Sequence, residues 1–281
     1  MVTKELINQK HMSMASKESE DIKEYWNQRA LAANKSPTAT TDDVFLRELE
    51  IKTFVKKIGE MNLKEDSVVV DVGCGDGYST LRIAAMFPCL KFVGIDYSDE
   101  MINTARRRLA EAAIAENQIV EFQVGDATTL SDIVPTNSAN VVMTDRCLIN
   151  LASPEAQYDA IEQISRILCK NGCYLAIENF IEGQNELNRT RAAIGLNEIP
   201  VRWHNLFFHE DEFLTRAKSY FKRVEIDNFS SAYYYATRVI YSKECQLNGT
   251  KPDYHHPIHQ LAVDLPSIGS CSPIKLAVLV K

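Results

Sequence analysis

The chain has 281 residues, 45% of them hydrophobic, and a formal net charge of −7. This length can bury a substantial core, and no uninterrupted apolar stretch reaches the roughly 18 residues that a membrane-spanning helix requires. The acidic charge counts against broad attraction to nucleic-acid phosphates or anionic membranes, so we expect neither as a partner.

The seven cysteines are scattered along the chain. Only Cys169 and Cys173 lie close together, and no second pair or nearby histidine completes a zinc-binding pattern. Several lie within apolar runs, as reduced core thiols do, which favours a cytoplasmic location. Residues 1–20 are polar and mixed in charge, without the apolar core of a secretory signal, so we expect them to form a flexible lead-in.

Helical patterns and apolar runs alternate between residues 21 and 180. Residues 21–60 are predicted to form N-terminal cover helices, and three further helices are expected over residues 78–87, 98–114 and 153–172. Ser98 or Asp99 is a suitable cap for the second of these three. Five strands are expected over residues 67–73, 91–97, 119–127, 139–146 and 173–180. This strict alternation predicts a parallel sheet that is covered by helices on both faces.

The regular alternation of helices and strands stops after residue 180. The insertions 181–208 and 230–273 are rich in aromatic residues, proline and histidine. One more helix and two more strands are expected over residues 209–221, 222–229 and 274–281. The predicted fold is therefore a doubly wound, mostly parallel, seven-stranded α/β sheet with insertions after strands five and six. Without an internal repeat or a low-complexity linker, residues 21–281 are expected to form a single domain with its core at 66–180.

Three glycines directly follow the first strand, in the stretch VVVDVGCGDGYST. Gly73, Gly75 and Gly77 have the spacing G-x-G-x-G, which is tighter than the G-x-G-x-x-G of dinucleotide sites. They allow either a tight structural turn or a close approach of the backbone to a ligand. Asp96 ends the next strand, where it could accept both hydroxyls of a ribose, and Asp126 ends the third, where it could accept from an exocyclic amine.

The stretches VVVDVGCGDGYST, FVGIDYS and FQVGDA together resemble the cofactor motifs of class I S-adenosylmethionine-dependent methyltransferases. The resemblance covers about residues 66–180 and extends to the C-terminus as a layout. It implies that the three glycines line the methionine part of the cofactor and that Asp71 anchors its amino group. It further implies that Asp96 binds the ribose and that Asp126, with Ala127 alongside, binds the adenine.

The stretch EYWNQRA, residues 24–30, resembles the N-terminal helix that closes over the cofactor in many of these enzymes. The resemblance implies that Tyr25 and Arg29 contact the ring or the carboxylate of the cofactor. Alternatively, the helix is amphipathic and packs Tyr25 and Trp26 on the domain. The two interpretations are compatible.

Methylation of an alcohol also requires a group that removes its proton. Asp145 and Arg146 lie at the end of the fourth strand, a position that faces the substrate in the resembling family, although an ion pair would also explain them. Asp145, Glu178 and Asn179 are similar to the metal triad of catechol-type O-methyltransferases, whose oxygen ligands suit Mg²⁺. The sequence departs from that group because it lacks the characteristic N-terminal helices and has Glu in place of Asp, so no metal is assigned.

The first insertion carries the stretch GLNEIPVRWHNLFFHE, a candidate active-site cover. Arg202, Trp203 and Asn205 are predicted, with Arg146, to contact the acceptor. His204 is the leading candidate for the general base because its unperturbed pKa near 6.5 suits proton transfer at neutral pH. Asp145 and Glu178 are the alternative catalytic residues.

We expect an S-adenosylmethionine-dependent methyltransferase for a small polar acceptor, with O-methylation of a sugar or related metabolite as the leading reaction. The layout resembles methyltransferases of bacterial polysaccharide and natural-product pathways. The alternatives are a Mg²⁺-dependent catechol-type enzyme or an N- or carboxyl-methyltransferase and, more distantly, a non-catalytic Rossmann binding protein or a NAD-dependent oxidoreductase. The expected partners are a small-molecule acceptor, with carbohydrates as candidates, and a second copy of the chain in a homodimer.

Overall fold

The computed structural model describes residues 19–33, 36 and 38–281, and it contains one seven-stranded sheet in the order β3-β2-β1-β4-β5-β7-β6. The strands are β1 Val68–Val72, β2 Lys91–Asp96, β3 Val120–Val124, β4 Ala139–Asp145, β5 Leu168–Asn179, β6 Arg223–Asp227 and β7 Ile274–Val280. β7 is antiparallel to both of its neighbours, and the other pairs are parallel. The predicted fold class is confirmed, and the strand order reverses direction between β1 and β4.

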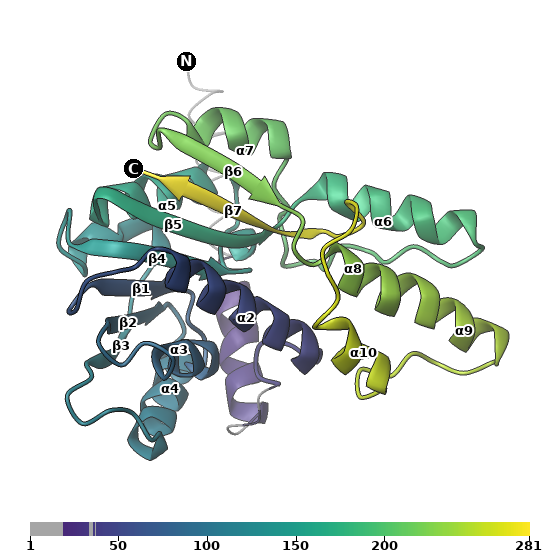
Figure 1. The fold of residues 1–281 in the computed structure, drawn as a ribbon, viewed down its shortest axis with the longest axis horizontal. Coiled ribbons are helices and arrows are strands. Elements are labelled where there is room, and N and C mark those ends of the chain that lie inside the picture. The colour runs from purple at the N-terminus through teal and green to yellow at the C-terminus, as the bar shows by residue number, and fades with distance from the viewer. Residues whose placement is uncertain (1–18, 34–35, 37) are drawn as a thin grey trace, which may run out of the picture.

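Helices cover both faces of this sheet, as Figure 1 shows. The larger helices near the sheet are α2 Val44–Glu60, α3 Tyr78–Ala84, α4 Asp99–Glu111, α5 Pro154–Ile167 and α7 Glu210–Ala217. Val69 packs in one core cluster with α2, α3 and α4, whereas its neighbour Val70 packs in another with α5 and α7. Alternating strand residues point to opposite faces, so the apolar run of β1 contributes to both layers of the core.

Two local expectations have different outcomes. Ser98 caps α4, because its side-chain oxygen accepts a hydrogen bond from the Met101 amide at 3.1 Å. The helix expected to reach residue 172 ends instead at Ile167, and β5 begins at Leu168. The register explains this error: Ala139 pairs with Leu168 and Val141 with Cys173, so residues 169–172 bulge out of the ladder.

The two insertions are largely helical, although no regular elements were expected in them. They contain α6 Ile181–Ala193, α8 Ser231–Tyr234, the π-helix η3 Tyr235–Ile240, α9 Tyr241–Leu247 and α10 Pro257–Ala262. These helices lie together beyond one end of the sheet (Figure 1), and we call residues 181–208 and 230–273 the helical lobe. Arg191 of α6 donates to the Arg238 carbonyl of η3, which joins the two insertions.

Short helical turns follow two of the strands: η1 Ala127–Asp132 and η2 Leu148–Asn150. Both begin within three residues of a strand end, so they place polar groups at the edge of the sheet where parallel strands finish. Across residues 19–33, 36 and 38–281, no helix is long and apolar enough to cross a membrane.

Candidate active site

The glycine-rich loop after β1 depends on backbone conformations that favour glycine. Gly73 and Gly75 have φ angles of +78° and +54°, in the left-handed region. A Cβ on Gly73 would lie 2.3 Å from the Cys147 sulfur, and one on Gly75 would lie 2.9 Å from a methyl carbon of Thr40. Both glycines line a cavity of about 280 Å³ at the carboxyl ends of the strands. Any larger residue would therefore collide with the protein itself.

Gly77 differs from the other two glycines because it does not line this cavity. Its φ is +72° at the N-cap of α3, and a Cβ there would lie 2.8 Å from Ala105 and from Phe122. The structure gives Gly77 a role in the close packing of α3 against α4 and β3, and its contact with the cofactor stays a prediction.

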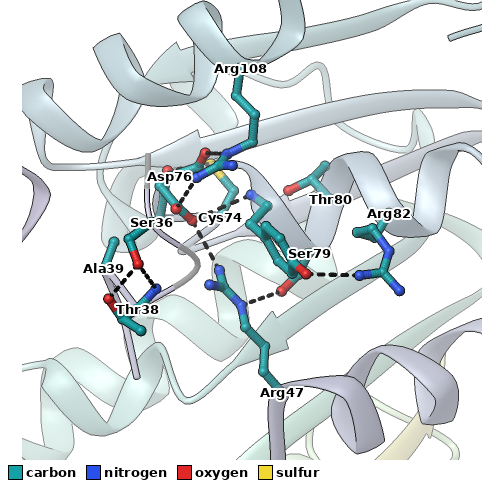
Figure 2. A network of polar contacts seen from close by, with 12 residues as sticks. Ser36, Thr38, Ala39, Arg47, Cys74, Asp76, Ser79, Thr80, Arg82 and Arg108 are labelled. Atoms are coloured by element: carbon teal, nitrogen blue, oxygen red, sulfur yellow. Dashed lines mark hydrogen bonds and ion pairs between the residues drawn. The ribbon is translucent and has the colours of Figure 1, made fainter. Parts of the chain in front are cut away.

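Asp76, inside the same loop, anchors the loop to two helices. Its buried carboxylate accepts hydrogen bonds from Arg47 of α2 at 3.0 Å and from Arg108 of α4 at 2.7 Å (Figure 2). Arg47 also donates to Ser79 at 3.1 Å. Removing one partner of such a buried pair leaves an uncompensated charge, so the network holds the loop in one position. Sequence reasoning assigned no role to Asp76, and only its place between two glycines hinted at one.

The cavity brings together most of the residues predicted to bind cofactor or acceptor. Besides Gly73 and Gly75, its predicted lining residues are Asp71, Asp96, Asp126, Ala127, Asp145, Arg146, Arg202, His204 and Asn205. Tyr25, Arg29, Gly77, Glu178 and Trp203 are the predicted site residues that do not line it.

Two buried carboxyl groups lie near the carboxyl ends of β1 and β2 on the cavity wall. Asp71 accepts a hydrogen bond from the Thr80 hydroxyl at 2.6 Å, and burial raises the pKa of its carboxyl to about 7. Asp96 accepts from the amides of Gly75 and Ser98, both at 2.9 Å, and burial raises its pKa to about 6. A carboxylate has about four acceptor positions, so both groups retain capacity for donors from a ligand.

The third strand places an exposed acid at the same cavity. Asp126 caps η1, because its carboxylate accepts from the amide and the hydroxyl of Thr128, both at 2.7 Å. Ala127 is buried beside it. Between Asp96 and Asp126 lies Tyr97, whose hydroxyl is buried without a hydrogen-bond partner among the described residues.

Four buried polar atoms without partners belong to cavity-lining residues, counted within residues 19–33, 36 and 38–281. They are Tyr97 Oη, Asn179 Oδ1, His204 Nε2 and Asn205 Oδ1. Buried polar groups are otherwise almost always hydrogen-bonded, so this concentration indicates a site that a polar ligand completes. Together with three acids at three successive strand ends, it fits a cofactor that donates ribose hydroxyls and amines.

The helix over residues 19–33 contributes two residues to the cavity lining, Ser19 and Trp26. Tyr25 stacks on His204 with ring centroids 4.8 Å apart. Arg29 donates to the carbonyls of Thr38 at 2.7 Å and Ala39 at 3.0 Å. Tyr25 thus packs on His204 and Arg29 holds the segment before α2, while their contacts with the cofactor stay predictions.

Asp145 and Arg146 end β4, and the Arg146 backbone takes a left-handed φ of +50°. The Arg146 guanidinium pairs with the fully buried Glu50 at 3.0 Å and with Asp145 at 3.5 Å. Burial raises the pKa of Glu50 above its usual range, even though the Arg146 charge opposes that shift. Arg146 is therefore held at the cavity wall by two carboxylates.

Glu178 faces the backbone of η2 and not the cavity, contrary to its predicted catalytic role. Its carboxylate accepts from the amides of Leu148 at 3.0 Å, Cys147 at 3.3 Å and Ile149 at 3.4 Å. Burial raises the pKa of Glu178 to about 7. Three amide donors leave this carboxylate little capacity for Mg²⁺, which argues against the catechol-type triad. In the described part of the chain, no three His, Cys, Asp or Glu side chains are grouped to hold a metal ion.

The stretch from Arg202 to Asn205 lies over the cavity in the helical lobe. Arg202 is exposed at the rim, whereas the 62% exposed Trp203 lies outside and packs edge-on against His204. His204 is 6% exposed, and its Nδ1 lies 2.9 Å from Asn150 Oδ1. Burial, followed by the nearby Arg202 charge, lowers the pKa of His204 below its usual value. The imidazole is therefore neutral at pH 7.

Sequence comparison identifies the family. Residues 63–223, more than half of the chain, match a family model described as a methyltransferase domain. The chain is 33% identical over 149 residues to the Probable cobalt-precorrin-6B C(15)-methyltransferase (decarboxylating) of Methanocaldococcus jannaschii, covering 53% of this chain and 68% of that protein. It is 37% identical over 82 residues to the trans-aconitate 2-methyltransferase of Variovorax paradoxus, covering 29% of this chain and only 31% of that protein.

The fold also has solved relatives. One is a chain in the complex between the Haloferax volcanii Trm112 methyltransferase activator and a methyltransferase, with a TM-score of 0.57 and 18% identity, covering 91% of this chain and 96% of that chain. At this identity the likeness shows the fold alone, whereas the family follows from the match over residues 63–223. The chain belongs to the methyltransferase domain family and is an S-adenosylmethionine-dependent methyltransferase.

Proposed function

We propose that this enzyme transfers the methyl group to an oxygen of a small polar acceptor, a sugar or a related hydroxylated metabolite. The observation that carries the proposal is His204, a buried and neutral imidazole on the cavity wall. Its Nε2 has no hydrogen-bond partner among the described residues. A hydroxyl group of the acceptor would donate to this nitrogen, and the same nitrogen would take the proton during the reaction.

The cofactor would be held along the carboxyl ends of β1, β2 and β3. Asp96 would accept from the ribose hydroxyls, Asp126 from the adenine amine and Asp71 from the amino group, with Gly73 and Gly75 allowing close backbone approach. S-adenosylmethionine supplies an electrophilic methyl group whose bond to sulfur breaks with the electron pair kept by sulfur. These assignments follow the order of the strands, because each acid comes from the next strand across this half of the sheet.

The enzyme's own residues then have two tasks. The acceptor oxygen forms the new bond to the methyl carbon, and its proton passes to His204 Nε2, which later returns it to water. Positioning and exclusion of water provide most of the remaining rate enhancement, because charge disperses during the transfer. Trp26 and the helical lobe cover the cavity and supply this exclusion.

The acceptor side of the cavity combines flat aromatic groups with hydrogen-bonding groups. Its aromatic members include Trp26, Phe207 and Tyr234, and its polar members include Asn179 and Asn205. Aromatic faces suit stacking on a sugar ring, and unpartnered amide oxygens suit hydroxyl donors. The relatives named above act on different acceptors by name, so they do not select one for this chain. A role in polysaccharide biosynthesis rests on the sequence resemblance alone.

Four further predictions belong to this proposal. The cytoplasmic location is supported by the seven cysteines, all of which are free thiols. A single domain over residues 21–281 is supported by the single sheet that joins β1 to β7. A homodimer and a carbohydrate acceptor stay predictions for solution measurements.

The test has two stages with the purified full chain. Calorimetric titration with S-adenosylmethionine, S-adenosylhomocysteine and NAD should show binding of the first two and none of the third. A screen with methyl-labelled cofactor should then compare nucleotide sugars and other hydroxylated metabolites with amines and carboxylic acids. Label confined to amines or carboxylic acids would overturn the assignment of a hydroxyl acceptor. Activity of His204→Gln that chelators abolish and Mg²⁺ restores would overturn the role of His204 as the base.

A further inference from the structure

Asn150 is the last residue of η2. Its side chain connects His204 to the backbone of Arg146, which directly follows β4. Its side-chain nitrogen donates to the Arg146 carbonyl at 2.8 Å. A carbonyl can only accept, so this bond fixes which end of the amide is the nitrogen. Asn150 Oδ1 must therefore be the atom that lies 2.9 Å from His204 Nδ1.

This arrangement determines the position of the imidazole proton. An amide oxygen accepts and cannot donate, so Nδ1 must carry the hydrogen in its contact with Asn150. A neutral imidazole has one N–H, which leaves Nε2 with a free lone pair. Nε2 is also the ring nitrogen that is buried without a partner among the described residues. The hydrogen bonds thus leave Nε2 as the basic nitrogen, without a hydrogen-bond partner among the described residues, while the nearby Asn205 side chain acts to raise the pKa of the ring.

The surrounding backbone is tied so that this contact keeps its geometry. The Arg146 amide donates to the Ile177 carbonyl at 2.7 Å, which fixes the left-handed residue whose carbonyl orients Asn150. Gln157 donates to the carbonyls of both Leu148 and Leu206, at 3.1 Å and 2.8 Å. Gln157 therefore joins η2 to the segment that carries His204.

The charged and titratable groups around His204 favour its neutral form. Arg202 on the same loop and Arg29 on the helix over residues 19–33 disfavour a second positive charge, and Tyr25 stacks on the ring. A carboxylate at position 150 would stabilise the imidazolium, whereas the amide has no net charge. The asparagine thus orients the ring without raising its proton affinity.

We propose that Asn150 is a positioning residue that holds His204 as the Nδ1–H tautomer and so presents the Nε2 lone pair to the acceptor hydroxyl. The inference deepens the proposed function and rests on it for its catalytic meaning. In the reaction, the acceptor proton passes to Nε2, and the Nδ1–H bond to Asn150 is retained throughout.

The direct test is nitrogen NMR of the free enzyme with ¹⁵N-labelled histidine, in which His204→Gln identifies the His204 signals. Wild-type protein should show a protonated Nδ1 and an unprotonated Nε2. Asn150→Leu should mix the two tautomers. Asn188→Leu is the matched control, because Asn188 tethers Ile199 in the same lobe without contacting His204, and it should leave the tautomer unchanged. A wild-type His204 protonated on Nε2, or an unchanged tautomer in Asn150→Leu, would overturn the inference.

A kinetic test follows once an acceptor is found. Asn150→Leu should lower kcat roughly 10- to 100-fold, which is less than the full contribution of a general base. Asn150→Asp should move the acidic limb of kcat/KM to higher pH, because a carboxylate stabilises the imidazolium. In a His204→Gln background neither substitution should cause a further loss. An unshifted acidic limb in Asn150→Asp, or additive losses in the double variants, would overturn the inference.

The two proposals fail in different measurements. An Nδ1–H tautomer in an enzyme that methylates only amines would support the structural part of the inference and overturn O-methylation. Proven O-methylation with the opposite tautomer would overturn the role of Asn150 alone.

Discussion

Carboxyl groups in two regions of the molecule respond to burial in opposite ways. At the cofactor edge, Asp71 and Asp96 are buried with neutral donors, and burial raises their pKa values to about 7 and about 6. Under the helical lobe, Asp43 is also buried, but it pairs with Arg238 and accepts from the Tyr233 hydroxyl at 2.6 Å. His259, Arg238 and Tyr233 hold its pKa well below the usual range despite burial. Among the described residues, Asp71 and Asp96 have no ion-pair partner, whereas Asp43 pairs with Arg238.

The largest effect is expected for His204, which belongs to the helical lobe and lines the cavity. His204→Gln should lower kcat on the order of 10²–10⁴-fold, the range for a general base, while the dissociation constant of the cofactor changes little. Single-turnover kinetics and calorimetry on the same preparation separate the two quantities. If kcat and cofactor affinity fell by the same factor, His204 would act in cofactor binding and not as the general base.

Asp43→Asn tests the buried ion pair between Asp43 and Arg238 of the helical lobe. It should lower the free energy of unfolding at pH 7 by about 3 kcal/mol, because Arg238 then stays buried without its ion pair. The folded-state pKa of Asp43 is lowered, so its stabilising contribution is present above its unfolded pKa of about 4 and is lost as the pH falls below it. Urea unfolding at pH 7 and at pH 3 should show the difference from wild type shrink at the lower pH.

The control for that variant is its neighbour. Asp42 pairs with Arg29 at 3.1 Å, but its side chain is 52% exposed. Asp42→Asn should therefore change stability by less than about 1 kcal/mol. Equal effects at positions 42 and 43 would contradict the assigned anchoring role of Asp43.

Asp96→Ala tests the cofactor side, where cofactor affinity should fall about 10- to 100-fold because hydrogen bonds to a charged acceptor are lost. The pKa of Asp96 is raised to about 6, so the ionised form that accepts two donors is lost as the pH falls through that value. Wild-type affinity should weaken between pH 8 and pH 5, and calorimetry should find a flatter dependence in Asp96→Ala. A dissociation constant unchanged by the substitution would remove the ribose assignment.

The last comparison concerns the glycine-rich loop, where the difference between two variants is measured. Gly249 has a left-handed φ of +67°, and a Cβ added there would meet nothing within 4 Å, whereas a Cβ on Gly73 would meet Cys147 at 2.3 Å. Gly249→Ala should cost about 1 kcal/mol of stability from the backbone alone, and Gly73→Ala about 1–3 kcal/mol more from the collision. Thermal unfolding of the two variants measures the difference. Equal costs would mean that Cys147 moves aside freely.

Sequence reasoning succeeded where the signal is local. The seven strands follow from apolar runs, the Ser98 cap from one residue before a helix, and the place of Asp96 on the cavity wall from its position at a strand end. The end of α5 was predicted wrongly. The boundary is set by the pairing of Leu168 with Ala139 on the neighbouring strand β4, and not by the Asn-Gly pair at residues 171 and 172.

In the candidate site, too, local motifs could be recognised from the sequence, whereas contacts between distant residues could not. Asp71, Asp96 and Asp126 were found from motifs, whereas Asp76 depends on Arg47 and Arg108, which lie 29 and 32 residues away. Asp43 and Arg238 are 195 residues apart, and no spacing rule connects them. Glu178 was chosen as catalytic because it ends a strand, but the direction of its carboxylate depends on how η2 folds back over it.

Both insertions of the helical lobe leave the sheet and return to it at fixed places. Residues 181–208 begin after Phe180 and end at Phe208, which form a bridge with each other, and residues 230–273 lie between β6 and its paired neighbour β7. For segments with such closely spaced ends, the closure entropy changes little with length. Exchanging or lengthening either segment in this chain should therefore leave the three acids at the strand ends in register.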